Sequence, residues 1–136
     1  MALVAVSIVG AENLPAEVFR RAGAALAARI EITGLGPVER EAGIAAMAVV
    51  LRTRIGPSAL EKMLRRLTPT SGSVSFGVLA YGALVYRDEE IVVPPANFAN
   101  LGAILRSLAR VDPDFQIPNL GNVSAHLSDS LDRPPN

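Results

Sequence analysis

The sequence contains no cysteine, and this absence excludes several kinds of chemistry. Without thiols there is no disulfide, no thiolate nucleophile and no cysteine-ligated metal, and a reducing compartment is compatible with the chain. A single histidine, His126, excludes a histidine-rich metal site as well. We therefore expect a cytoplasmic protein that carries no metal and no other cofactor.

Aromatic residues are also scarce: the chain has four phenylalanines, two tyrosines and no tryptophan. Half of its residues are hydrophobic, so the core must consist of alanine, leucine, valine and isoleucine. No apolar run reaches the ~20 residues that a membrane-spanning helix needs. The apolar opening, residues 1–11, lacks the positively charged start of a signal peptide.

The net charge is zero, which excludes strong nonspecific binding of polyanions through overall charge. The charges are nevertheless unevenly distributed. Basic residues outnumber acidic ones between Arg20 and Arg66, and the balance reverses from Arg87 onward. This asymmetry favours either contact between copies of the chain or a locally basic face for an anionic partner.

Residues 39–67 predict two helices in tandem, separated by a short break at residues 54–57. In the second helix, apolar residues recur three and four positions apart, as they do on the buried side of a helix: Leu60, Met63, Leu64 and Leu67. The first helix is apolar nearly all round, which is typical of a helix enclosed by neighbours. We expect it to be the centre of a bundle or an oligomer interface.

The other segments complete a mainly α prediction. Residues 3–9 suit a short buried strand, or an arm laid against another subunit, and helices are expected at about 13–30 and 97–110. Residues 73–93 fit either a small β-hairpin or a buried helix. The predicted fold is a single-domain bundle of four to five helices over residues 1–111, with an N-terminal arm at 1–11. Residues 112–136 are expected to form an extended, proline-containing tail.

The motifs that carry catalytic chemistry are weak. Residues 73–77 approach a nucleophile elbow around Ser75, but serine replaces the first glycine. His126 has no partner histidine, and the adjacent carboxylates Asp88, Glu89 and Glu90 diverge in an extended chain. Residues 34–37 lack the lysine of a phosphate-binding loop. We therefore predict that the chain is not an enzyme and has no small-molecule substrate, and an enzyme using Ser75 or His126 ranks third.

Nucleic acid is the chemical hypothesis that most residues support. The two tandem helices and the hairpin could form a winged helix-turn-helix, and this regulator is the alternative function. Its phosphate contacts would come from basic residues: Arg52, Arg54, Lys62, Arg65 and Arg66.

The surplus of apolar helix surface favours assembly over regulation. We predict a structural protein that forms homo-oligomers, such as a coat or nucleocapsid-like subunit, with nucleic acid as a further candidate partner. The candidate interface residues are Ile44, Met47, Val50, Leu51, Leu105 and Leu108.

Overall fold

The computed structural model describes residues 2–71, 73–87, 92–95, 102–118 and 120–132. Its centre is a sheet in the order β2-β4-β1-β5, and a further short strand, β3, also pairs with β4. The strands are β1 (Ala2–Ala11), β2 (Ile32–Leu35), β3 (Glu39–Glu41), β4 (Ile44–Thr53) and β5 (Val74–Tyr81). Every pairing in this sheet is antiparallel.

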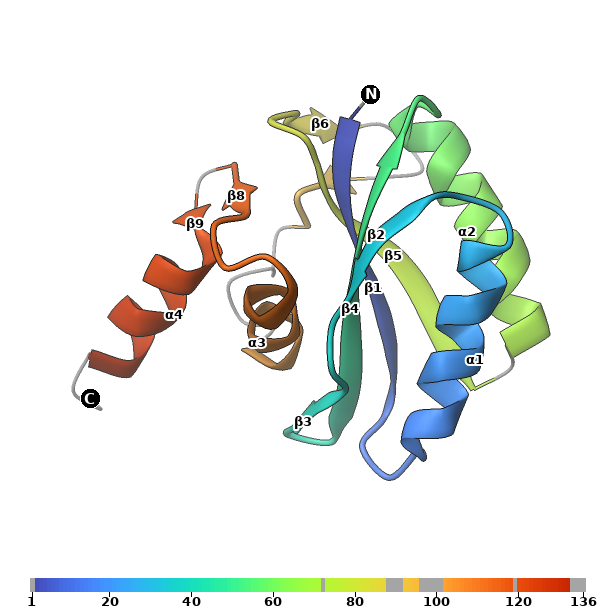
Figure 1. Ribbon diagram of the computed structural model, residues 1–136, viewed down its shortest axis with the longest axis horizontal. Helices are drawn as coiled ribbons and strands as arrows, with labels where there is room; N and C mark the ends of the chain where they lie inside the picture. Colours follow the sequence, from blue (N-terminus) through green and yellow to red (C-terminus); the bar gives the residue numbers. More distant parts are fainter. Residues whose placement is uncertain (1, 72, 88–91, 96–101, 119, 133–136) are drawn as a thin grey trace.

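Helices cover both faces of the sheet (Figure 1). Helix α1 (Ala16–Ala27) connects β1 to β2, and α2 (Pro57–Ser71) connects β4 to β5. Both lie on one face, which we call the first face, whereas α3 (Gly102–Val111) lies on the opposite, second face. Each β-α-β unit leaves room for one strand of the other, which is the split β-α-β arrangement.

Residues 44–53, expected to be helical, form the central strand β4. Their side chains alternate between the two faces: Ala45, Met47, Val49 and Leu51 join the core under α1 and α2, and Ala46, Ala48 and Val50 join the core under α3. A strand buried on both faces is apolar at every position. Residues 44–50 therefore lack polar side chains because they form a strand enclosed on both faces, and not because they form a helix enclosed by neighbours.

A two-residue turn at Ala42 and Gly43 joins β3 to β4. Glu41 pairs with Ile44, and both turn residues have positive φ, 53° at Ala42 and 85° at Gly43. Positive φ at both central positions is the geometry of a type I′ hairpin turn, which matches the twist of the flanking strands. The turn thus lies near the start of the segment, residues 39–53, where the first of the two tandem helices was predicted.

The predictions for α1 and α2 are confirmed. Helix α2 begins at Pro57, and its apolar stripe is buried at Leu60, Leu64 and Leu67. Each helix carries an ion pair between residues four apart: Glu17 and Arg21 lie 3.3 Å apart on α1, and Glu61 and Arg65 lie 3.6 Å apart on α2.

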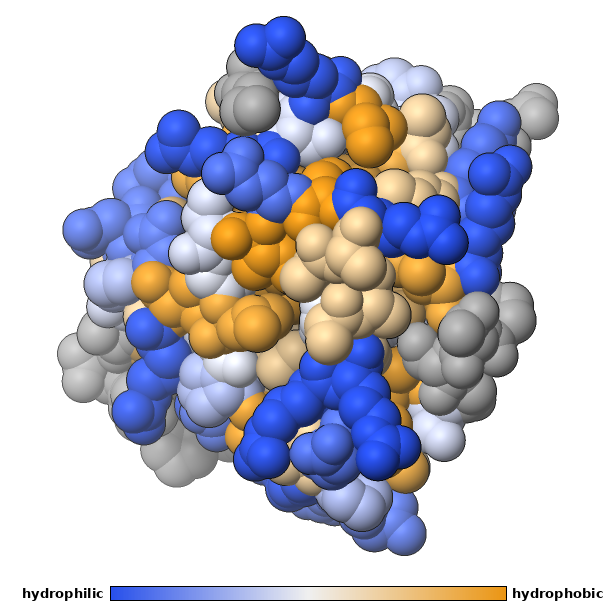
Figure 2. Space-filling model, turned by 45° about the vertical axis from the view of Figure 1, so that its right-hand side comes forward, coloured by the Kyte–Doolittle hydropathy of each residue, from blue (hydrophilic) through white to orange (hydrophobic). Residues whose placement is uncertain are grey.

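The outer side of α1 carries small apolar residues. Ala24, Ala27 and Ala28 are exposed there, and Leu35 of the neighbouring β2 is 52% exposed. Figure 2 brings this side forward and shows apolar side chains gathered among hydrophilic ones. The larger apolar side chains of α1, Phe19 and Leu26, are fully buried.

The C-terminal part contains regular structure where an extended tail was expected. Strands β8 (Gln116–Ile117) and β9 (Gly121–Asn122) form a small hairpin, and α4 (Val123–Asp132) follows it. Phe115, Ile117 and Val123 are buried in the core of the second face. A second small hairpin, β6 (Tyr86–Arg87) with β7 (Val92–Val93), lies in the segment where hairpin and helix were both considered.

The mainly α fold prediction is therefore wrong, because the chain folds as mixed α/β around an antiparallel sheet. The argument for assembly fails with it. The apolar run at residues 3–9 is the middle of β1, and one copy of the chain buries its Val4, Ala5, Val6 and Ile8 completely. In the described part of the chain, no helix is long and apolar enough to cross a membrane.

Gly36 allows α3 to approach the sheet edge. A Cβ atom at this position would lie 2.6 Å from the backbone oxygen of Ser107, whereas one at Gly56 would meet nothing within 4 Å. We expect Gly36→Ala to lower the free energy of unfolding by about 1–3 kcal/mol, because α3 must shift. Gly56→Ala should change it by about 1 kcal/mol or less. Urea unfolding of both variants measures the difference, and equal effects would contradict this packing.

Candidate functional site

Among the residues that the structure describes, α3 covers one side of the second face of the sheet. Helix α3 buries the β4 residues Ala46 and Ala48, but the adjoining part of β1 and β5 stays accessible. Four residues form this part, which we call the open floor: Ser7 and Val9 of β1, and Ser75 and Gly77 of β5. Ser75 is exposed, Val9 and Gly77 are half-buried, and Ser7 is 8% exposed.

Strand register brings the open floor together from two distant parts of the sequence. Ser7 lies opposite Gly77, and Val9 lies opposite Ser75. The Ser7 hydroxyl donates a hydrogen bond to the Gly77 carbonyl oxygen at 3.4 Å. A Cβ atom at Gly77 would lie 3.3 Å from the Ser7 Oγ, so a side chain there would be crowded. The floor is consequently flat, with small side chains and hydroxyl groups.

Helix α3 forms the wall beside this floor, and Ser107 attaches it to the sheet. The Ser107 side chain is fully buried; its hydroxyl accepts a hydrogen bond from the Ala48 N–H at 2.9 Å and donates one to the Pro37 carbonyl oxygen at 2.6 Å. Between β2 and β3 the sheet is interrupted, and this hydroxyl takes the place of a neighbouring strand. The wall is thereby fixed relative to the floor.

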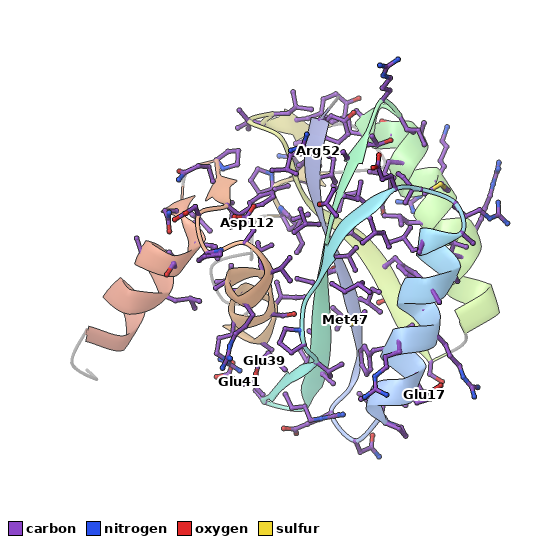
Figure 3. The ribbon with its side chains drawn as sticks, viewed as in Figure 1. Glu17, Glu39, Glu41, Met47, Arg52 and Asp112 are labelled. Carbon is purple, nitrogen blue, oxygen red and sulfur yellow. The ribbon has the colours of Figure 1, made fainter. Side chains whose placement is uncertain are left out.

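An ion-pair cluster holds the other side of α3 to β3. Arg106 lies 3.0 Å from Glu41 and 3.9 Å from Glu39, the two carboxylates labelled beside α3 in Figure 3. The three side chains are partly exposed, so each pair contributes modestly to stability. The main consequence of these ion pairs is that the carboxylates of Glu39 and Glu41 are both paired with the Arg106 guanidinium.

Strand β5 ends the sheet on the floor side. In the part of the chain that the structure describes, it pairs along its length with β1 alone. The outer row of backbone N–H and C=O groups on an edge strand can form hydrogen bonds with a bound molecule. A flat ligand on the floor would therefore meet backbone donors and acceptors along one side.

The basic residues proposed for nucleic-acid contact lie away from the open floor. Arg52 is at the end of β4, at the upper end of the sheet in Figure 3, and Arg54 is in the following loop. Lys62, Arg65 and Arg66 are exposed on α2, which covers the first face. The winged helix-turn-helix is excluded by the fold, because its first helix is strand β4.

Most of the proposed interface residues lie inside the chain's own cores. Five are at most 3% exposed: Met47, Val50, Leu51, Leu105 and Leu108. Ile44 is 38% exposed at the end of β4. Packing within one copy accounts for the apolar character of the five buried residues.

The residues considered as catalytic candidates do not belong to one catalytic motif. Ser75 lies inside strand β5 and not at a strand-turn-helix junction, so the nucleophile elbow is absent there. His126 is half-buried on α4. Asp88, Glu89 and Glu90 lie outside the described residues. The sequence did contain a signal for the floor, since Ser75 and Gly77 alternate with the apolar residues of β5.

No protein-family model matches this chain, and no curated protein matches it significantly. Solved structures do. The wild-type HPPK-DHPS of Plasmodium falciparum with SDX-DHP matches with a TM-score of 0.75 and 7% identity, over 98% of this chain and 44% of that one. The same protein with pterin and p-hydroxybenzoate matches with a TM-score of 0.75 and 8% identity, over 97% and 42%. With pteroate the values are 0.74, 7%, 97% and 43%.

This likeness shows the fold, which the chain shares with part of HPPK-DHPS. This chain spans less than half the length of the HPPK-DHPS chains. Three predictions are thereby corrected: the non-enzymatic role, the coat-like structural protein, and the homo-oligomer or nucleic-acid partner without a small-molecule substrate. The assembly role rested on a helical bundle that the chain does not form, and the non-enzymatic role rested on the weakness of the catalytic motifs.

Ser107 provides a test of the wall. Ser107→Ala should leave the buried Ala48 N–H and the Pro37 carbonyl oxygen without their partner, and lower the free energy of unfolding by about 1–3 kcal/mol. The matched control is Ser73→Ala, at an exposed position, with an expected change within about 0.5 kcal/mol. Denaturant unfolding followed by circular dichroism measures both. Equal losses would show that the two hydrogen bonds add nothing to stability.

Proposed function

We propose that this chain is a small enzyme domain of the HPPK type that recognises a pterin-class heterocycle on its open floor. The observation that carries the proposal is the match of nearly the whole chain to HPPK-DHPS, including a structure that holds pterin. The chain forms a sheet with an accessible face in place of the predicted helical bundle.

The shape of the open floor supports a flat ligand. Gly77 has no side chain, and the side chains of Ser7, Val9 and Ser75 are small, so a planar ring could lie close to the backbone. Burying one face of a ring against such a surface removes apolar area from water, at about 25 cal/mol per Å².

The polar groups around the floor suit the edge of a pterin. Such a ring system carries amide-like N–H and C=O groups and an exocyclic amine, which need partners when they leave water. The Ser75 hydroxyl both donates and accepts, and the outer edge of β5 adds backbone groups. A ligand lying between α3 and this edge would be bound by shape and by hydrogen bonds together.

The proposal concerns recognition of the heterocycle. Pteroate and p-hydroxybenzoate are bound by the much longer HPPK-DHPS, and they are not carried over to a chain that spans less than half of it. A cytoplasmic location accompanies the proposal and is compatible with the absence of cysteine.

Titration calorimetry with pterin tests the proposal. We expect saturable binding with a micromolar dissociation constant, and at least about tenfold weaker binding by Gly77→Leu, because the leucine side chain occupies the floor. The matched control is Ala24→Leu on the outer side of α1, which should bind as the unaltered chain does. Absence of pterin binding by the unaltered protein, or equal binding by both variants, would reject the proposed site.

Ser75 tests the polar contribution. Ser75→Ala removes one exposed hydroxyl from the floor and should weaken pterin binding by about 0.5–1.5 kcal/mol without altering unfolding. Ser73→Ala, just before the strand, is the control. An unchanged dissociation constant for Ser75→Ala would mean that this hydroxyl does not contact the ligand.

A further inference from the structure

Helix α3 is attached to the sheet in two different ways, and its C-terminal half is held by close packing. A Cβ atom at Gly36 would lie 2.6 Å from the Ser107 backbone oxygen. A Cβ atom at Gly34 would overlap the Val111 side chain. The Ser107 hydroxyl adds its hydrogen bonds to the sheet. All of these groups are uncharged, so dissolved salt should affect the contacts little.

The N-terminal half of α3 is held by charged groups as well. The Glu41 carboxylate lies beside the first residue of the helix, because a Cβ atom at Gly102 would be 2.6 Å from Glu41 Oε2. The Arg106 guanidinium, one turn further along, donates a hydrogen bond to the same oxygen at 3.0 Å. A carboxylate at the start of a helix also interacts favourably with the helix dipole. An ion pair thus supplements the packing of the buried Ile104 and Leu105 side chains.

Strand β3 connects this attachment to the floor strand β1. Its three residues are all charged, and their side chains alternate between the two faces. Glu39 and Glu41 face Arg106 on α3. Arg40 instead donates hydrogen bonds to the carbonyl oxygens of Glu12 and Leu14, in the connection that follows β1. One short strand therefore links the wall to the end of a floor strand.

The position of α3 matters for a ligand on the open floor. A ligand between α3 and the edge of β5 would contact the wall, and an attachment that already holds the wall in place lowers the ordering cost of binding. A partly exposed ion pair contributes modestly, and binding can gain no more from it than the pair contributes. The expected influence on the dissociation constant is therefore at most about fivefold.

We infer that Arg106 is a positioning residue: its ion pair with Glu41 sets the position of α3 and thereby the affinity of the open floor for an uncharged heterocycle. The inference rests on the proposed function, because the ligand is the one proposed there. An uncharged ligand forms no ion pair of its own, so its binding would ordinarily be almost independent of salt. Here salt weakens the attachment of the wall, and the binding weakens with it.

Calorimetric titration with pterin at about 20 mM and about 0.5 M NaCl tests this inference. For the unaltered chain we expect binding about two- to fivefold weaker at the higher salt concentration. Arg106→Gln should already bind about two- to fivefold more weakly at the lower concentration, without a further loss at the higher one. Arg106→Lys keeps the positive charge and should restore both the salt dependence and most of the affinity.

The matched control is Arg21→Gln, which removes the ion pair with Glu17 on α1. It should bind pterin as the unaltered chain does at both salt concentrations. Equal affinities of Arg106→Gln and Arg21→Gln would overturn the inference, and so would salt-independent binding by the unaltered chain. Absence of pterin binding by the unaltered chain rejects the proposed function, and a second measurement then decides the role of Arg106.

The second measurement needs no ligand. Ile104 and Leu105 are buried and precede Arg106 directly on α3, so the NMR signals of their methyl groups report how this part of the helix packs. We expect these signals to shift with rising NaCl in the unaltered chain and in Arg21→Gln, but not in Arg106→Gln. A salt response that persists in Arg106→Gln, or the absence of a response in the unaltered chain, would overturn the inference.

Discussion

The structure depends on the pairing of β1 with β4. The two strands run antiparallel over ten residue pairs, from Ala2 opposite Thr53 to Ala11 opposite Ile44. Each of the two strands contributes side chains to the cores on both faces of the sheet. A ladder that satisfies its own backbone groups can be enclosed in this way. Helices α1 and α2 on one face, and α3 on the other, take their positions from it, and so does the open floor.

The fold was only partly predictable from the sequence, and the failure has a physical cause. Amphipathic helices show their period, so α1 and α2 were predicted with nearly correct bounds. A strand buried on both faces shows no alternation, and β4 contains three alanines, a residue that favours helices. The turn at residues 42–43 could not be predicted from the sequence either, because alanine rarely adopts positive φ. Long-range pairing with β1 overrides these local preferences.

The candidate site was less predictable still. Half of the floor was visible as the alternation of Ser75 and Gly77 with Val74, Phe76 and Val78. The other half of the floor consists of Ser7 and Val9, which are distant from β5 in the sequence. Only the strand register places them opposite Gly77 and Ser75. Charged and nucleophilic side chains are recognisable in a sequence, which is why residues such as Arg65 and His126 were candidates. A neutral surface of small residues has no recognisable sequence motif. It becomes a candidate binding site only because α3 lies beside it.

The interruption between β2 and β3 also affects how the molecule behaves in a crowded solution. A long regular strand at a sheet border can recruit strands from other molecules and start aggregation. Here the border is broken at residues 36–38, where Pro37 has no N–H to donate and Ser107 already occupies the gap. This border is therefore a poor template for fibril growth. A helix that detached from it would remove that protection before the sheet itself unfolded.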